Sequence, residues 1–445
     1  MSVNIQQEFA NEVARRLQQA GYQALWAGGC VRDHLLELTP DDYDVATDAR
    51  PEQVRKLFGH KATLAIGASF GVILVLGPNP DSHVEVATFR TEGPYLDGRH
   101  PSAVTFATPQ EDARRRDFTI NGMFLDPFTD QLYDYVGGQQ DLDHRIIRAI
   151  GDPRQRFAED KLRLLRAVRM AARFDAQIEP ATAAAVRSMA SELPVVSPER
   201  IAQELRKMLV HNRRRRAVEL AYQLGLLEVI FPEFTPLLPC SSATQPANPP
   251  AAPPDWQTTL KMLDRLQSPS FPLAFATLLR GIDRSDTAGE CATATPQPPA
   301  GGVAEVCHRL RLSNAEAQQT LWLTEHQHAL DNAPALPLPK LKRLLVEAGI
   351  DDLRALQRAR AEVTGEGRAA VEFCEQFLRN TPPGVLNPAP LLTGNDLIAH
   401  GLKPGAAFKR LLEQVRDAQL EGTLGTREQA LQLVDQLQRN SGEAM

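Results

Sequence analysis

A change of sequence pattern near residue 152 constrains the fold of this chain more than any other feature. Before it, short runs rich in β-branched residues (YDVAT, GVILVLG and HVEVATF) alternate with helical patterns and predict strands. After it, long stretches rich in Ala, Leu and Arg repeat with a helical period, and strand signals almost vanish. We therefore expect an α+β head followed by an all-α remainder.

Proline-rich stretches divide the helical part further. At 445 residues the chain is too long for a single ordinary core. Segments rich in Pro and small residues, at 236–255, 292–302 and 380–390, are typical of spacers. The sequence predicts five parts in chain order: a head at 1–150, a helical neck at 151–235, a Pro-rich linker at 236–255, a helical body at 256–380 and a helical tail at 381–445.

The composition narrows the class of protein. Hydrophobic residues make up 43% of the chain and charged residues 23%, which is typical of a soluble globular protein. No apolar run has the length of a membrane span. The 5 cysteines are scattered without CxxC pairs, which argues against a disulfide framework or a zinc site. We therefore expect a cytoplasmic location.

The charge is distributed unevenly along the chain. Residues 145–216 hold 17 Lys and Arg against 8 Asp and Glu, a local net charge of +9 in a chain whose net charge is −6. A basic stretch indicates a phosphate-rich partner if it folds onto one face. A solvated helix with incidental arginines is an equally good explanation on charge alone.

Two glycines and two aspartates form the first candidate site. Gly28 and Gly29 stand between a predicted strand and a predicted helix, where backbone can approach a polyphosphate and Arg32 can add a planar fork of donors. Asp42 and Asp44 would share one face of a strand, and two such carboxylates suit Mg²⁺. Two metal ions there could activate an attacking hydroxyl and stabilise a leaving pyrophosphate. A polar strand edge with a helix cap is the alternative, but the neighbouring glycines favour catalysis.

The run RRDFTING (115–122) is the second candidate site. Arg116 can hold a phosphate, Asp117 can accept a hydrogen bond from a ribose 2′-hydroxyl, and Asn121 can donate or accept. Two arginines followed by an aspartate more commonly form a surface ion-pair cluster, so the residues alone leave both interpretations open.

The run EDKLR (159–163) is the third candidate site. On one helix, Glu159, Asp160 and Arg163 would share a face. An Asp acceptor beside an Arg donor matches the exocyclic amine and ring nitrogen of cytosine and of adenine, and it opposes the carbonyl and N–H of uracil and guanine. Such a pair could select C and A without a nucleic-acid template. The alternative is an ordinary helical ion pair, which is common and contributes little.

These motifs, in this order, resemble the class II (bacterial-type) tRNA nucleotidyltransferase and poly(A) polymerase family. GGCVRDHLLEL with DDYDVAT resembles its metal-binding motif, RRDFTING its ribose motif and EDKLR its nucleotide-reading motif. Further similar segments are TFRTEGPYLDGRHP (88–101), like its flexible loop, SPERIAQEL (197–205), like a neck motif, and LLTGNDLIAHGLKPG (391–405), like its C-terminal segment. The resemblance implies a polymerase-β-like nucleotidyltransferase head, with a mixed sheet and helices, followed by an all-α neck, body and tail.

The resemblance also assigns roles around the triphosphate. Asp42 and Asp44 would be the catalytic residues and would hold two Mg²⁺ ions. Glu85 would be either a third carboxylate near the metals or a structural strand residue. The triphosphate would contact Gly28, Gly29 and Arg32.

The sugar and base would lie farther along the same site. The ribose would contact Arg116, Asp117 and Asn121. The base edge would be read by Asp160 and Arg163, with Glu159 orienting Arg163.

The implied activity is the addition or repair of the 3′-terminal CCA of tRNA from CTP and ATP, with release of pyrophosphate. A specialised A-adding enzyme, a CC-adding enzyme or a poly(A) polymerase remains an alternative. The loop at 91–101 speaks against a CC-only enzyme, and the C-terminus lacks the basic tail of a poly(A) polymerase. A non-catalytic tRNA-binding protein or a small-molecule nucleotidyltransferase is more distant. In LLRGIDR (278–284), Arg280 and Gly281 replace a metal-binding His-Asp pair of many relatives, so we expect no second, hydrolytic activity.

Overall fold

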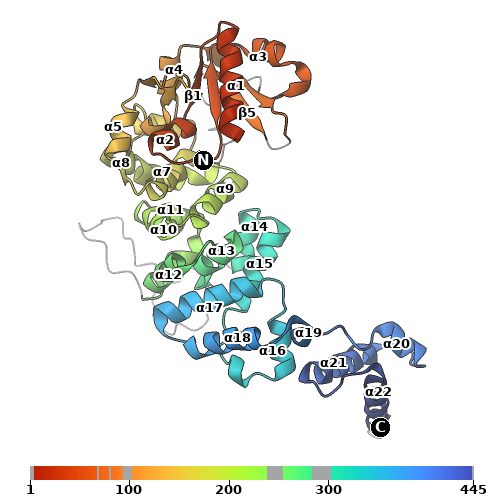
Figure 1. The fold of residues 1–445 in the computed structure, drawn as a ribbon. Coiled ribbons are helices and arrows are strands. Elements are labelled where there is room, and N and C mark those ends of the chain that lie inside the picture. The colour runs from red at the N-terminus through yellow and green to blue at the C-terminus, as the bar shows by residue number, and fades with distance from the viewer. Residues whose placement is uncertain are drawn as a thin grey trace. The chain divides into compact units, whose positions relative to one another are not determined.

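The computed structural model describes residues 5–67, 70–79, 82–93, 103–237, 254–282 and 302–442. Contacts divide the chain into two compact units. The first holds Met1–Pro236 together with short segments that include His308–Leu312, and the second holds most of the remainder. All described strands belong to the first unit, as Figure 1 shows. The finer division into five parts stays a prediction, and most of the Pro-rich residues at 236–255 and 292–302 lie outside the described part.

A seven-stranded mixed sheet forms the core of the head. Its strand order is β3-β4-β5-β2-β1-β8-β9, in which β2 and β5 run parallel and the other neighbours antiparallel. The strands are β1 Ala24–Ala27, β2 Asp44–Thr47, β3 Thr63–Gly67, β4 Val72–Leu76, β5 His83–Thr88, β8 Met123–Leu125 and β9 Leu132–Asp134. The predicted α+β head with a mixed sheet is confirmed.

Burial on the sheet follows the alternation of the strand sequences. In β5, Val84, Val86 and Thr88 are buried while His83 and Glu85 are exposed, as expected for side chains that alternate between the two faces. Helix α1, Ile5–Gln19, contacts β1 and β5 with its buried residues Ala10, Val13, Ala14 and Leu17. These residues recur at helical spacing and form a single apolar stripe. One face of the sheet is therefore covered by α1.

Short elements complete the head. They are α2 Gly29–Leu35, α3 Pro51–Phe58, η1 His60–Ala62, the antiparallel hairpin β6 Arg90–Glu92 with β7 Val104–Phe106, α4 Pro109–Arg114, η3 Thr119–Asn121, α5 Gly138–Asp143 and β10 Ile146–Ile147. The flexible loop predicted at 88–101 thus begins in β5 and β6, and its residues 94–101 lie outside the described part.

Helices make up the rest of the first unit. They are α6 Pro153–Glu159, α7 Leu162–Arg173, α8 Pro180–Met189, η4 Ala190–Val195, α9 Pro198–Leu209, α10 Arg214–Gln223, α11 Leu226–Ile230 and η5 Pro232–Leu237. The two-residue strand β11, Gln177–Ile178, returns to pair in parallel with β10. Helix α7 also packs against α9 and α10, and this packing buries Leu164, Leu165 and Val168.

The second unit is helical throughout its described residues. Its helices are α12 Pro254–Arg265, α13 Phe271–Leu279, α14 Val303–Arg309, α15 Asn314–Glu325, η7 Ala333–Ala335, α16 Leu338–Leu344, α17 Ile350–Thr364, α18 Arg368–Asn380, α19 Pro383–Leu386, α20 Gly394–Ala399, α21 Ala406–Glu421 and α22 Arg427–Gly442. The stretch at 380–390, predicted as a linker, contains the one-turn helix α19. No described helix combines the length and apolarity needed to cross a membrane.

Candidate active site

A glycine turn opens the site in the head. Gly28 follows β1 with a φ of 74°, which glycine adopts without steric cost. A Cβ atom on Gly28 would lie 2.9 Å from Nη1 of Arg116, so a side chain there would displace that guanidinium. Gly29 then begins α2. The turn therefore leaves the backbone open beside a fixed positive charge.

Arg32 lies one turn into α2 and is 4% exposed. Its Nη1 donates to Oδ1 of Asn121 at 2.6 Å, and its Nε donates to Oδ1 of Asp33 at 2.8 Å. The guanidinium carbon also lies 4.5 Å from the centre of the Phe174 ring. Burial lowers the pKa of Arg32, and the neighbouring Asp33 counteracts this. The guanidinium is therefore held in one place before any ligand binds.

The two predicted metal ligands do not both lie in a strand. β2 begins at Asp44, and Asp42 precedes it as an exposed residue. The prediction of a shared strand face is wrong for Asp42. The reason lies in the partner strand: β1 ends opposite Asp44, because the chain turns away at Gly28, and Asp42 has no antiparallel partner there.

Asp44 lies among other carboxylates. It is the register partner of Glu85 on the parallel strands β2 and β5, so the two side chains start from the same face of the sheet. Burial raises the pKa of Asp44 to about 6; Glu85 and Asp42 add to the rise, and Arg116 opposes it. A divalent cation such as Mg²⁺ would relieve the repulsion between these oxygens, so the donor set fits the ion. Among the described residues, no three His, Cys, Asp or Glu side chains form a group that could hold a metal ion.

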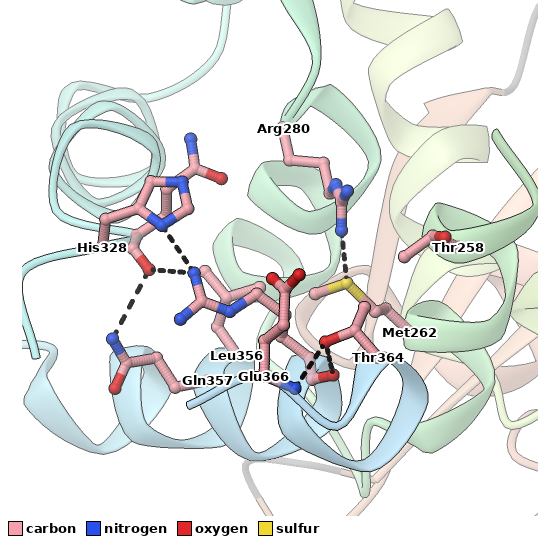
Figure 2. A pocket seen from close by; sticks show the side chains of 10 residues that line it. Thr258, Met262, Arg280, His328, Leu356, Gln357, Thr364 and Glu366 are labelled. Atoms are coloured by element: carbon pink, nitrogen blue, oxygen red, sulfur yellow. Dashed lines mark hydrogen bonds between the residues drawn. The ribbon is translucent and has the colours of Figure 1, made fainter. Parts of the chain in front are cut away.

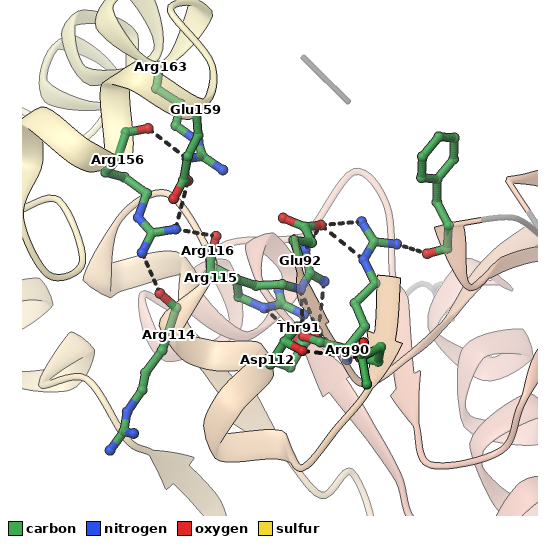
Figure 3. Close-up of polar contacts among 12 residues, drawn as sticks. Arg90, Thr91, Glu92, Asp112, Arg114, Arg115, Arg116, Arg156, Glu159 and Arg163 are labelled. Carbon is green, nitrogen blue, oxygen red and sulfur yellow. Dashed lines mark hydrogen bonds and ion pairs between the residues drawn. The ribbon is translucent and has the colours of Figure 1, made fainter. Parts of the chain in front are cut away.

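Asp112 is the anion that organises the two adjacent arginines (Figure 3). Its Oδ1 accepts from Arg115 at 2.7 and 2.9 Å, and its Oδ2 accepts from Arg116 at 3.0 and 3.1 Å. Burial alone would raise the pKa of Asp112, but Arg116 and Arg115 hold it below its ordinary value. The run RRD therefore does belong to an ion-pair cluster, with Asp112 rather than Asp117 as its carboxylate.

Asp117 and Asn121 form a buried relay between two arginines. Asn121 accepts from Arg32 and donates through Nδ2 to Oδ1 of Asp117 at 3.0 Å. Oδ2 of Asp117 accepts from Nη2 and Nε of Arg166 at 2.6 and 2.8 Å. Burial would raise the pKa of Asp117, but Arg166 and Asn121 hold it far below its ordinary value. The carboxylate is therefore ionised and largely occupied by protein donors, and its predicted contact with a ribose stays a prediction.

The EDKLR run is a corner between two helices rather than part of one helix. α6 ends at Glu159 and α7 begins at Leu162, and Asp160 is extended with φ −147° and ψ 107°. The predicted single helix is wrong here because the backbone is extended at Asp160, whose side chain accepts from the backbone N of Leu162 at 3.0 Å. Glu159 nevertheless pairs with Arg163, as expected.

Asp160 pairs with an arginine from another helix. Its Oδ2 accepts from Nη2 of Arg200 at 2.6 Å, and its Oδ1 accepts from Nη1 at 3.1 Å. Arg200 lies in the first turn of α9, within the motif SPERIAQEL. The acceptor and the donor of the predicted reading pair thus have different partners, Arg200 for Asp160 and Glu159 for Arg163.

These groups surround one pocket of about 470 Å³ in the first unit. Of the predicted site residues, its wall contains Gly28, Gly29, Arg32, Asp44, Arg116, Asp117, Asn121, Asp160 and Arg163. Asp42, Glu85 and Glu159 do not line it. Its arginines are Arg32, Arg115, Arg116, Arg163, Arg166, Arg169, Arg173 and Arg200, and they outnumber the three lining aspartates. This excess of planar cations suits a polyanion such as a triphosphate.

A second cavity, of about 370 Å³, lies in the helical second unit (Figure 2). Arg280 of the LLRGIDR run lines it and approaches the sulfur of Met262. Arg360 also lines it, contacts His328 and pairs with Asp331. None of the predicted nucleotide-site residues lines this cavity.

Comparison with protein families and solved structures agrees with this geometry. Residues 24–148 match the poly A polymerase head domain, and residues 175–238 match the probable RNA and SrmB-binding site of polymerase A. These two matches make the head and neck similar to the head and RNA-binding domains of poly A polymerases. The resemblance found in the sequence is thus confirmed for this part of the chain.

Individual proteins are similar to this chain as well. The CCA-adding enzyme of Bacillus subtilis is 42% identical over 217 residues, which are 48% of this chain and 53% of that protein. The chain thus spans about half the length of the curated relatives that it matches. The Bacillus stearothermophilus CCA-adding enzyme in complex with CTP has the same fold, with a TM-score of 0.72 and 24% identity over 99% of this chain and 100% of that one. The Thermotoga maritima CCA-adding enzyme complexed with tRNA gives a TM-score of 0.62 and 19% identity, covering 96% of this chain and 94% of that one.

Sequence reasoning missed five arginines that line the pocket. They are Arg115, Arg166, Arg169, Arg173 and Arg200. A signal for three of them was present: Arg166, Arg169 and Arg173 recur at spacings of three and four residues, which places them on one face of α7. Arg200 stood inside a recognised motif, but its partner Asp160 is 40 residues away in the sequence. No local pattern could have paired them.

Proposed function

We propose that this chain adds or repairs the 3′-terminal CCA of tRNA, using CTP and ATP and releasing pyrophosphate. The observation that carries the proposal is the single pocket in which eight arginines surround Asp44 and the Asp160 and Arg163 side chains share a wall. The names of its relatives, CCA-adding enzymes solved with CTP and with tRNA, support the same activity. The acceptor would be the tRNA 3′ end, and the partners would be tRNA and nucleoside triphosphates.

The triphosphate would lie against the glycine turn. Gly28 and Gly29 present backbone without side chains, and Arg32 and Arg116 lie beside them at fixed positions. Because these guanidiniums are already oriented by Asn121 and by Asp112, binding costs little side-chain entropy. This arrangement supports tight and oriented binding of a polyphosphate.

Asp42 and Asp44 would hold two Mg²⁺ ions, with Glu85 close enough to Asp44 to affect its charge. When bound, the ions activate the 3′-hydroxyl of the acceptor and stabilise the charge of the departing pyrophosphate. Asp44 must be ionised for this role, and with its pKa at about 6 it is ionised near neutral pH. The pocket arginines neutralise the remaining phosphate charge.

Base choice would rest on the corner between α6 and α7. Asp160 would accept from the amine of C or A, and Arg163 would donate to the unprotonated ring nitrogen beside it. Uracil and guanine present the opposite pattern and would place a carbonyl against Asp160 and an N–H against Arg163. A site that leaves a buried donor or acceptor unpaired loses about 1–3 kcal/mol for each group, which is sufficient to reject the wrong base.

In the test, purified protein is incubated with one of three tRNAs and one nucleoside triphosphate at a time. The three tRNAs end before CCA, after the first C and after CC. CMP addition to the first two and AMP addition to the third is the expected result. AMP addition alone would identify an A-adding enzyme, CMP addition alone a CC-adding enzyme, and repeated AMP addition a poly(A) polymerase. Absence of all incorporation, with tRNA binding retained, would identify a non-catalytic tRNA-binding protein.

A further inference from the structure

We propose that Arg156 is a positioning residue that sets the orientation of Arg163 and thereby contributes to the choice of C and A. The proposal rests on the proposed function, because it concerns the same base-reading pair. Arg156 does not line the nucleotide pocket. It would therefore act through its neighbours and not by touching the substrate.

The guanidinium of Arg156 anchors the end of α6 to the head. Its Nη2 donates to the carbonyl of Arg114 at 2.7 Å, and its Nη1 donates to the carbonyl of Arg115 at 3.0 Å. These carbonyls lie at the C-terminal end of α4, where a helix has unpaired acceptors and favours a cation. Its Nε also donates to the carbonyl of Ile150 at 3.2 Å. One planar fork thus fixes three backbone positions.

The guanidinium of Arg156 is linked to that of Arg163 because both donate to Glu159 (Figure 3). Oε2 of Glu159 accepts from Nη1 of Arg156 at 2.9 Å and also from Nη1 of Arg163. Nη1 of Arg163 makes a further bond, at 2.8 Å, to the backbone carbonyl of Arg156. The Arg163 guanidinium is therefore held at one nitrogen, while its Nε and Nη2 donate to no other described protein residue.

Asp160 depends on a separate support. It is held by Arg200 from α9, and its side-chain hydrogen bonds to arginine all come from that residue within the described part of the chain. The side chains of Arg156 and Arg163 are 14% and 11% exposed, so their contacts are shielded from water. Loss of the Arg156 side chain would free Glu159 to move away, so Arg163 would keep only its bond to the backbone carbonyl at position 156, while Asp160 kept its bonds to Arg200. The substitution should therefore weaken the donor half of the reading pair alone.

A double-mutant cycle separates this role from a general effect on stability. The cycle compares the unsubstituted protein with Arg156→Ala, Arg163→Ala and the double variant. Each protein is given tRNA and equimolar CTP, ATP, UTP and GTP, and the amount of each nucleotide incorporated is measured. Arg156→Ala should reduce the preference for CTP and ATP by roughly tenfold, as expected when an oriented hydrogen bond is lost. In the Arg163→Ala background it should cause no further change in preference beyond about twofold, because residues that act through one another are not additive.

Two variants complete the test. Arg154→Ala removes an exposed arginine from the same helix and should leave preference unchanged. Arg156→Lys keeps the charge but cannot span the carbonyls and Glu159 together, so it should show an intermediate loss of preference with a raised KM for both nucleotides.

Equal effects of Arg156→Ala in both backgrounds, or a lowered melting temperature with unchanged preference, would overturn the proposal. If Arg156→Ala does not fold, unchanged preference in Arg156→Lys would overturn it. A full-length protein that adds neither CMP nor AMP would instead refute the proposed function.

Discussion

Asp117 keeps its charge in a buried position because donors surround it. Arg166 and Asn121 contact its two oxygens, and the backbone N of Phe118 donates at 2.8 Å. Such an arrangement stabilises the carboxylate more than burial destabilises it. Arg166 is 49 residues away in the sequence, so no local pattern indicates the pair. At this scale the sequence can predict the residue type at a site and partners within one helical turn, but not partners far away in the chain.

Substitution of Asp117 by Asn should lower the free energy of unfolding by about 1–3 kcal/mol, because the Arg166 guanidinium loses its counter-ion. The folded-state pKa lies below the unfolded value of about 3.9, so the stabilisation is fully present above that value and is lost as the pH falls through the folded pKa. Urea unfolding of both proteins between pH 3 and pH 8 measures this. A stability difference that already disappears between pH 6 and pH 5 would contradict the assigned ion pair.

The charge of Asp44 changes the stability of the folded state with pH in the opposite direction. Its pKa is raised to about 6, so its ionised form destabilises the folded head above that pH, and stability rises as the pH falls from about 6 toward 4. Asp44→Asn should therefore melt at the same temperature or slightly higher at pH 7.5. Nucleotide transfer should nevertheless fall by at least about a thousandfold, because several kcal/mol of metal-assisted stabilisation are lost. The exposed neighbour Asp41 supplies the control: Asp41→Asn should retain transfer. Near-normal incorporation by Asp44→Asn with Mg²⁺ would contradict its role.

The corner between α6 and α7 is the element that departs most from its sequence pattern. Spacing predicted one helix through Glu159 and Arg163, and the pairing of these two residues is found even though the helix is broken. The break lies at Asp160, whose side chain accepts from the backbone N of Leu162 and is held by Arg200. Tertiary contacts of this kind override helix propensity. Strands were easier to predict, because β2, β4 and β5 carry β-branched runs, whereas the start of β2 depends on where β1 ends.

Substitutions at this corner should change base choice while sparing chemistry. Asp160→Ala should relax discrimination against UTP and GTP by about 1–3 kcal/mol, roughly ten- to a hundredfold. Arg163→Ala should lower the use of CTP and ATP together, because both ring nitrogens need its donor. Competition among the four nucleoside triphosphates measures both effects. A small loss of melting temperature with unchanged C and A selectivity would mean that the groups form only an ordinary ion pair.

Across the whole molecule, the local charge predicted which stretch supplies most of the pocket arginines better than it predicted single contacts. The excess of +9 at 145–216 in a chain of −6 indicated a phosphate-rich partner, and Arg148, Arg163, Arg166 and other arginines of that stretch are found in buried or half-buried ion pairs. The solvated-helix alternative is thus wrong for these residues. The second unit carried weaker signals, since helical periods predict helices but not their packing partners.

Binding to tRNA should weaken steeply with salt, because arginines that contact phosphates release counterions. Each phosphate contact changes the slope of the logarithm of the binding constant against the logarithm of the salt concentration by about −0.7 to −0.9. Filter binding between 50 and 300 mM KCl gives the slope for the full-length protein. Arg215→Ala, in the basic run at the start of α10, should reduce it by about one contact if that run follows the RNA. A flat dependence of affinity on salt would show that the basic region is not the RNA-binding surface.

The most direct test of the account is to sequence the 3′ ends made from a tRNA that lacks CCA. The full-length protein is incubated with Mg²⁺ and equal concentrations of all four nucleoside triphosphates, so that only the protein can choose the base. We expect product ends that read C, CC and finally CCA, with U and G rare and with extension ending after A. Ends that contain U or G as often as C and A, or that continue into a run of A, would contradict a protein pocket that selects C and then A.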